Sequence, residues 1–336
     1  MVNSRKLLIL EDGTQLTRLV TPDAESRGYQ LITYRDATGV LVMARQLQAD
    51  AMLLDGQIRG AGSVIALKAF RRNANTAALP IVAVVGRTGP QAEALVAAGA
   101  QACVSEPYDA RKLLDAVDSN LQAELDFTAG PAQALAEPEQ VEATAEAHII
   151  DTPPDPAFDR LTRLSSQLLM APVSLATFVT KTRQFFKSAV GLGDPWATKR
   201  ETPLTHSFCQ WVVSSREPLI VDDAREHKVL RENQAIRDLG VIAYAGVPMT
   251  GKGGLAIGSF CAVDTKPRKW SDDDLKTLQD LATVAEAYSH PEPSRHRDAV
   301  AAASRMLRRY GSRLRDPERD ELLNIVEEQT LRLAPR

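Results

Sequence analysis

AMLLDGQIR, at residues 51–59, runs four apolar residues directly into Asp55 and then breaks at Gly56. A short, continuous apolar run that ends at glycine is typical of a strand buried on both faces, as in a parallel sheet. Open sheets with helices on both faces place their chemistry at the carboxyl ends of the strands. We therefore expect the side chain of Asp55 to emerge at the functional edge of such a sheet.

A second strand end carries acids in the same way. Residues 6–10, KLLIL, lead directly into Glu11 and Asp12, so that three carboxylates follow two strands. Hard divalent cations take oxygen ligands, and three carboxylates at matching strand ends therefore suggest a cation site. The alternative, that each acid only caps the helix after its strand, suits one acid better than three.

The same alternation of strands and helices continues to residue 121. We expect strands at 6–10, 30–34, 51–55, 81–85 and 102–104, and helices near 13–27, 37–46, 63–73, 90–98 and 109–121. Pro22 predicts that the first helix is short or irregular. Strands alternating with helices imply right-handed crossovers, so the expected fold class is α/β, a doubly wound parallel sheet of five strands.

Residues 5–123, roughly a third of the chain, resemble the receiver domain of two-component response regulators, which has a flavodoxin-like fold. Leu10-Glu11-Asp12 matches the family's acidic pair, and Leu54-Asp55 its phosphoryl-accepting aspartate. Ala98-Gly99-Ala100 matches the turn before the fifth strand, and Glu106-Pro107 falls on the family's Lys-Pro. These motifs occur in the family's order and at its spacing.

The resemblance implies a phosphorylation site and a metal site at one edge. Asp55 would be the phosphoacceptor, a histidine kinase or another signalling protein the partner, and Mg²⁺ the cofactor. The implied metal ligands are the carboxylates of Glu11, Asp12 and Asp55 and the carbonyl of Gln57. Crowded carboxylates of this kind should raise the pKa of one of them.

Three positions depart from the family's pattern. In the family a lysine contacts the phosphoryl group, a Thr or Ser hydroxyl donates to it, and an aromatic side chain reports the event. Here Glu106, Val85 and Cys103 fall on those positions. Because Glu106 would face a group with nearly two negative charges, we expect a degenerate switch that binds Mg²⁺ without lasting phosphorylation.

The length and composition predict a globular protein of two or three domains. Its 336 residues are 44% hydrophobic and 25% charged, and the net charge of −3 with a pI near 6.0 predicts no nucleic-acid partner. No apolar run is long enough for a signal sequence or a membrane span. Three widely spaced cysteines (Cys103, Cys209 and Cys261) favour a reducing compartment, so we expect a cytoplasmic protein.

An acidic stretch separates the receiver-like part from the rest. Residues 113–159 hold eleven Asp and Glu and no Lys or Arg, with several prolines and few large apolar residues. We expect a stiff, self-repelling linker there. The expected domains are a receiver at 1–125, a linker at 126–154, a second domain at 155–290 and a helical tail at 291–336.

The sequence of the second domain predicts an α+β fold, in which helices flank an antiparallel sheet. Ser271 is expected to cap its last helix. Residues 157–289 resemble a GAF domain, the small-molecule sensory module of many bacterial signalling proteins. The motifs are RQFFKS (183–188), SFC (207–209), PLIVDDA (218–224), YAGVP (244–248) and GSFCAVD (258–264). A ligand pocket is implied between the sheet and residues 191–213, lined by Phe178, Trp196, Phe208, Cys209 and Tyr244.

The tail predicts two short amphipathic helices that pack on a partner or on a second copy, and hence a homodimer. Residues 295–315 hold seven Arg and one acid, which we interpret as a solvated helix face. The sequence as a whole predicts a bacterial signalling protein that acts by binding rather than catalysis, with no catalytic residues. Two alternatives stay open: an ordinary phosphorelay response regulator phosphorylated on Asp55, and a GAF-type free methionine sulfoxide reductase that uses Cys209 and Cys261.

Overall fold

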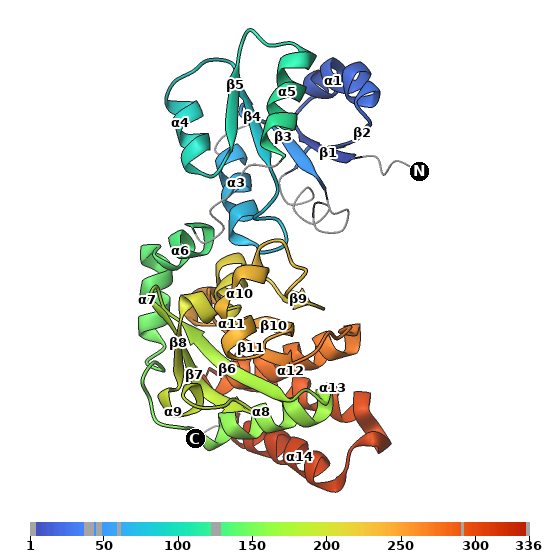
Figure 1. Cartoon of the computed structure of the whole chain (residues 1–336). Helices are drawn as coiled ribbons and strands as arrows, with labels where there is room; N and C mark the ends of the chain where they lie inside the picture. Colours follow the sequence, from blue (N-terminus) through green and yellow to red (C-terminus); the bar gives the residue numbers. More distant parts are fainter. Residues whose placement is uncertain are drawn as a thin grey trace. The chain divides into compact units, whose positions relative to one another are not determined.

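The computed structural model describes residues 5–36, 44, 49–58, 62–121, 129–289 and 292–333. The chain divides into two compact units, residues 1–130 and 131–336, and each contains one sheet (Figure 1). The helix expected at 37–46 lies outside the described residues, apart from Ala44. None of the described helices combines the length and the apolar character needed to cross a membrane.

The sheet of the first unit has five parallel strands in the order β2-β1-β3-β4-β5. Leu10 pairs with Leu54 and Asp55 with Val84, so that neighbouring strands end at the same edge. This order is that of the flavodoxin-like doubly wound fold, which confirms the expected fold class. The strands are β1 (Arg5–Leu10), β2 (Tyr29–Tyr34), β3 (Ala51–Asp55), β4 (Ile81–Val85) and β5 (Ala102–Ser105).

Helices cover both faces of this sheet because side chains alternate along each strand. Leu7 and Ile9 of β1 pack with α1 (Gln15–Ser26) and α5 (Ala110–Asn120). Leu8 and Leu10 face the other way, toward α3 (Gly62–Arg72), and the cluster on that side includes Leu95 of α4 (Pro90–Ala97). Figure 1 shows these helices on the two sides of the sheet.

The prediction that Pro22 makes the first helix short or irregular is wrong. Helix α1 runs without a break from Gln15 to Ser26, with Pro22 inside it. Proline in a helix interior costs about 3 kcal/mol. Leu16, Val20 and Ala24 form a stripe that is at most 4% exposed, and the burial of such a stripe offsets that cost.

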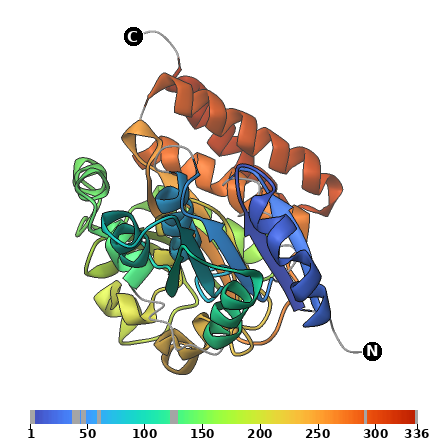
Figure 2. The same cartoon turned by 90° about the horizontal axis from the view of Figure 1, so that it is seen from above.

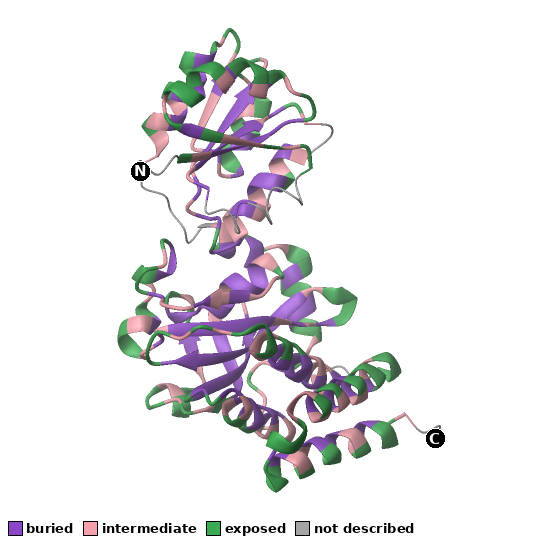
Figure 3. Cartoon of the chain, turned by 90° about the vertical axis from the view of Figure 1, so that its right-hand side faces the viewer, coloured by how far each residue is buried: buried purple, intermediate pink, exposed green. Residues whose placement is uncertain are grey.

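The second unit contains a six-stranded antiparallel sheet, ordered β8-β7-β6-β11-β10-β9. Its central strands are buried on both faces (Figure 3). One face packs against α8 (Pro156–Leu169) and α12 (Asp272–Ser289). The strands are β6 (Val173–Val179), β7 (Arg183–Val190), β8 (Glu201–Pro203), β9 (Leu219–Val221), β10 (Ala243–Thr250) and β11 (Ala256–Asp264).

Short helices complete this unit. Ser271 caps α12 as expected: its hydroxyl accepts from the backbone N–H of Asp274, whose carboxylate accepts from the Ser271 N–H. Helix α10 (Cys209–Ser215) packs against β11 and β10. Two further short helices are α9 (Trp196–Lys199) and α11 (Gln234–Asp238).

The tail differs from the expectation of two short helices docked on a partner. Helices α13 (Pro293–Tyr310) and α14 (Asp316–Leu331) are long and lie side by side (Figure 2). Buried residues of both join the core beside α12, because the apolar stripes of these helices find a surface on their own chain. Arg305 and Arg309, from the basic run, pair with the buried Asp280 of α12.

The expected linker is also partly folded. It contains α6 (Ala129–Leu135) and α7 (Pro138–Glu146). The Gln140 side chain of α7 donates from Nε2 to the Ala256 carbonyl at 2.7 Å, and Ala143 and Ile149 belong to the core of the second unit. Residues 131–150 are therefore part of that unit rather than a free tether, because a small apolar face on α7 and a buried amide suffice to dock it.

Candidate functional site

Asp55 ends β3 at the carboxyl edge of the first sheet, where its half-buried carboxylate is held by the backbone. Its Oδ1 accepts a hydrogen bond of 2.8 Å from the N–H of Gln57. Burial raises the pKa of Asp55, the Gln57 hydrogen bond opposes this, and the charges of Glu11 and Asp12 raise the pKa further. Burial, rather than the crowding of carboxylates that we expected, is thus the largest cause of the raised pKa of Asp55.

Glu11 makes contacts that differ from those of a metal ligand. Its buried carboxylate accepts from the backbone N–H groups of Leu16 at 2.8 Å and Thr17 at 3.1 Å, and from the Thr17 hydroxyl at 2.5 Å. It thereby caps the start of α1, where N–H groups lack partners within the helix. Within the described part of the chain, no three His, Cys, Asp or Glu side chains are grouped to hold a metal ion.

The three degenerate switch positions lie around this edge in different environments. Val85 is 1% exposed and packs in the same apolar cluster as Leu95, so nothing polar from this residue faces the edge. Cys103 is half-buried, and its Sγ lies 3.6 Å from the Ala92 carbonyl. Glu106 is exposed. Burial raises the pKa of Tyr108, and the negative charges of Glu106 and Asp55 raise it further.

Several residues at this edge were missed by the sequence reasoning. Glu106 lies between two open hollows, one lined also by Arg87 and Thr88 and the other by Arg18 and Tyr108. Arg87 could have been found, because it follows the end of β4 at the same edge. The side chain of Gln91, by contrast, donates to the Gly56 carbonyl at 2.7 Å, a contact that no pattern in the sequence indicates.

The residues expected to line a GAF ligand pocket lie in three different places. Phe178 packs against Phe158 of α8, with ring centroids 6.3 Å apart, in the core beside α12. Phe208 and Tyr244 contact each other on the α10 side, with centroids 5.3 Å apart. Trp196 is half-buried and contacts the tilted ring of His206, with ring centroids 5.0 Å apart, and His206 Nε2 shares a hydrogen bond with Asp238.

Cys209, the first residue of α10, belongs to a compact polar cluster between this helix and the sheet. Its Sγ is 3.2 Å from the Tyr244 hydroxyl and 3.9 Å from the Sγ of Cys261. The Tyr244 hydroxyl is also 3.2 Å from Ser259 Oγ. A Cβ on Gly246 would meet the Tyr244 hydroxyl oxygen at 2.1 Å, so only glycine lets this phenol lie across the strand.

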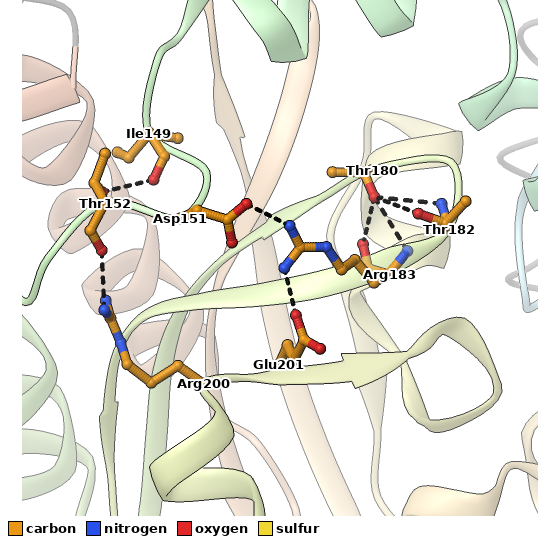
Figure 4. Close-up of polar contacts among 8 residues, drawn as sticks. All are labelled: Ile149, Asp151, Thr152, Thr180, Thr182, Arg183, Arg200 and Glu201. Atoms are coloured by element: carbon orange, nitrogen blue, oxygen red, sulfur yellow. Dashed lines mark hydrogen bonds and ion pairs between the residues drawn. The ribbon is translucent and has the colours of Figure 1, made fainter.

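A second polar cluster fixes the segment before α8 to the edge of the GAF-like sheet (Figure 4). Arg183 of β7 donates to Asp151 at 2.6 Å and also pairs with Glu201 of β8. Arg200 donates to the Thr152 carbonyl at 2.9 Å. These contacts clamp residues 151–152, and we call this group of residues the entry clamp.

Lys187 is also part of the entry clamp. Its side chain is 7% exposed, and its ammonium donates to Thr152 Oγ1 at 2.8 Å and to the Pro153 carbonyl at 2.9 Å. Burial lowers the pKa of Lys187, and the nearby charge of Asp155 opposes that effect. A buried amine that binds backbone in this way fixes the path of the chain into the domain.

Lys187→Met should lower the free energy of unfolding by about 1–3 kcal/mol, because it removes the buried ammonium that donates to Thr152 Oγ1 and to the Pro153 carbonyl. Protease cleavage between residues 147 and 155 should become faster. Urea denaturation and limited proteolysis measure both effects. Lys181→Met, at an exposed position of the neighbouring turn, is the matched control. Equal behaviour of the two variants would contradict a role of the entry clamp.

Comparisons with known proteins bear on both units. Residues 153–288 match the family model of the GAF domain. A cyclic di-GMP phosphodiesterase of Pseudomonas aeruginosa is 27% identical over 138 residues, which cover 40% of this chain and 23% of that protein. The chain thus spans less than a quarter of that relative's length.

Solved structures similar to this chain include receiver proteins. A chemotaxis response regulator of Vibrio cholerae has a TM-score of 0.32 and 22% identity, over 34% of this chain and 95% of that one. The receiver domain of a sensor histidine kinase from Pseudomonas aeruginosa, crystallised with magnesium in its active-site cleft, has a TM-score of 0.33 and 19% identity, over 36% and 100%. The strand order of the first unit is that of the flavodoxin-like fold, and residues 153–288 of the second unit match the GAF domain model.

Proposed function

We propose that this protein is a signalling protein that works by binding and conformational coupling, with a receiver unit that does not hold a phosphoryl group on Asp55. The observation that carries the proposal is a pair of residues at the same sheet edge as Asp55: an acid, Glu106, and the buried apolar Val85. A transferred phosphoryl group is stabilised by cations and donors aimed at its oxygens. Compared with the receiver family, Glu106 puts a negative charge in the place of a lysine, and Val85 puts a methyl group in the place of a hydroxyl donor.

In our proposal, the remaining oxygen atoms at this edge bind Mg²⁺. The carboxylates of Asp12 and Asp55 and the carbonyl of Gln57 would be its ligands, whereas the carboxylate of Glu11 is taken up by α1. When bound, the ion would supply positive charge beside Asp55. Asp55 stays held by the Gln57 N–H, which keeps its carboxylate oriented at the edge.

The docked helix α7 and the entry clamp support the coupling part of the proposal. Gln140, Thr152 and Pro153 are held to the GAF domain by hydrogen bonds. In our proposal, a change in the GAF core is passed through these contacts to the segment that precedes the domain. A small-molecule ligand in the GAF domain, a homodimer and a partner histidine kinase stay predictions. The activity of the phosphodiesterase relative belongs to a much longer protein, and we propose no turnover for this chain.

Incubation of the full-length protein with acetyl phosphate and Mg²⁺ should give no lasting phosphorylation, because the product lacks the cation and the hydroxyl donor that would hold it. Phosphate-affinity electrophoresis reads the result, with Asp55→Asn as the control. A stable shift in the parent protein that disappears in Asp55→Asn would overturn the proposal. The ordinary response-regulator alternative would then take its place.

A further inference from the structure

Two buried thiols face each other where α10 packs on the sheet. Cys209 is the first residue of α10, and Cys261 lies in β11 between β6 and β10. Their side chains are 2% and 0% exposed, and their sulfurs are 3.9 Å apart although 52 residues separate them in the sequence. We propose that Cys209 and Cys261 are an oxidation site that closes to a reversible intramolecular disulfide on reaction with a hydroperoxide.

The geometry requires one small movement. A disulfide bond is about 2.05 Å long, so the two sulfurs must approach by about 2 Å. Cys261 is held between two paired strands, opposite Gly246 on one side and Leu175 on the other. Helix α10 has only seven residues, so it is the element that moves toward the sheet. Disulfide formation therefore shifts the start of α10 toward β11.

The chemistry balances with hydrogen peroxide, the simplest hydroperoxide, as the only oxidant. The sulfur of Cys209, having lost its proton, attacks one peroxide oxygen; the O–O bond breaks, and the departing oxygen takes that proton and leaves as water. Cys209 is then a sulfenic acid. The sulfur of Cys261 attacks this sulfur, the S–O bond breaks, and the departing hydroxide takes the thiol proton as a second water. Two thiols have lost two electrons and hydrogen peroxide has gained them.

The surroundings favour Cys209 as the attacking thiol. Burial by itself raises its pKa, but hydrogen bonds from Cys261, Thr177 and Tyr244 outweigh burial and lower the pKa of Cys209 to about 7. The hydrogen bond to Cys209 raises the pKa of Cys261, and burial adds to that rise. Because the thiolate is the nucleophile, this division gives one attacking and one resolving cysteine.

Thiol counting on the full-length protein tests the proposal. After hydrogen peroxide treatment and denaturation, titratable thiols should fall from three to one, and reduction with dithiothreitol should restore all three. Peptide mapping by mass spectrometry should find Cys209 joined to Cys261. Loss of one thiol only, or covalent dimers through these residues on a non-reducing gel, would overturn the proposal.

Matched variants separate this pair from the third cysteine. Cys103→Ser, in the other unit, should still lose two thiols, now from two to none. Cys209→Ser should keep both remaining thiols at the same peroxide dose. Cys261→Ser should lose one, because Cys209 still forms a sulfenic acid but has no second thiol to close the disulfide. Circular dichroism checks that each variant is folded. If either variant fails to fold, the peptide map of the parent protein decides the question alone.

The oxidant distinguishes this site from a reductase. Free methionine sulfoxide in place of peroxide should leave all three thiols titratable. Loss of two thiols for each methionine formed would overturn the proposal in favour of the reductase alternative. The phosphorylation state of Asp55 does not enter any of these measurements, so the inference stands or falls separately from the proposed function.

Discussion

The double change Glu106→Lys with Val85→Thr should raise the yield of stable phosphoryl-Asp55 at least about tenfold over the parent protein. The lysine restores a cation beside the phosphoryl oxygens, and the threonine restores a hydroxyl donor at the end of β4. Both positions are at the same edge of the sheet as Asp55, since β4 pairs Val84 with Asp55 and the Glu106 N–H donates to the Val85 carbonyl.

The expected size follows from the charge reversal. Two unit charges about 4 Å apart interact by about 4 kcal/mol at an effective dielectric of 20. Glu106 is exposed, so solvent screens much of this. A remainder of about 1.4 kcal/mol already corresponds to tenfold. Val85 is 1% exposed, so its replacement should lower stability slightly while it adds the donor.

Acetyl phosphate labelling followed by phosphate-affinity electrophoresis measures this yield over time. Glu25→Lys with Val85→Thr is the matched control, because it makes the same change in net charge on exposed α1 near the opposite edge. Adding Asp55→Asn to the double variant should abolish the signal. A double variant no better than the parent would show that the charge of Glu106 does not set phosphoryl acceptance.

Leu322→Ala should lower the free energy of unfolding by about 2–5 kcal/mol, whereas Leu323→Ala should change it by about 0.5 kcal/mol or less. The two leucines are neighbours on α14, but Leu322 is 0% exposed and Leu323 is 48% exposed. Leu322 belongs to the same core as Leu281 of α12, so its removal leaves a cavity there. Urea denaturation followed by circular dichroism compares the two variants.

Truncation after Ser289 should have a still larger effect. It removes the buried side chains of α13 and α14, which include Met306, Leu322 and Ile325, and it leaves Asp280 without Arg305 and Arg309. Each fully buried large side chain contributes about 1.5–3 kcal/mol, and whole domains are stable by about 5–15 kcal/mol. The truncated protein should be unfolded or aggregated. Cooperative unfolding at the parent's urea midpoint would contradict this.

Much of the fold could be predicted from local patterns. The apolar run before Asp55 and the matching run before Glu11 determine two buried strands, because only a sheet covered on both faces hides such runs. Their common edge follows from parallel pairing. Ser271 likewise identifies a helix start, since its hydroxyl reaches a backbone N–H three residues away. In each case the physical cause lies within a few residues of its effect.

The candidate sites depended on contacts that such patterns do not contain. Nothing local determines that the Glu11 carboxylate turns to α1, or that Phe178 faces α8 while Tyr244 faces α10. The tail looked unpartnered because its apolar stripes could pack on any surface, and only the folded chain supplies α12 for them. The 3.9 Å between Cys209 and Cys261 is likewise set by the pairing of β11 with β10 and by the packing of α10 on the sheet. Such distances between residues far apart in sequence are fixed by packing of the whole core, which no single segment encodes.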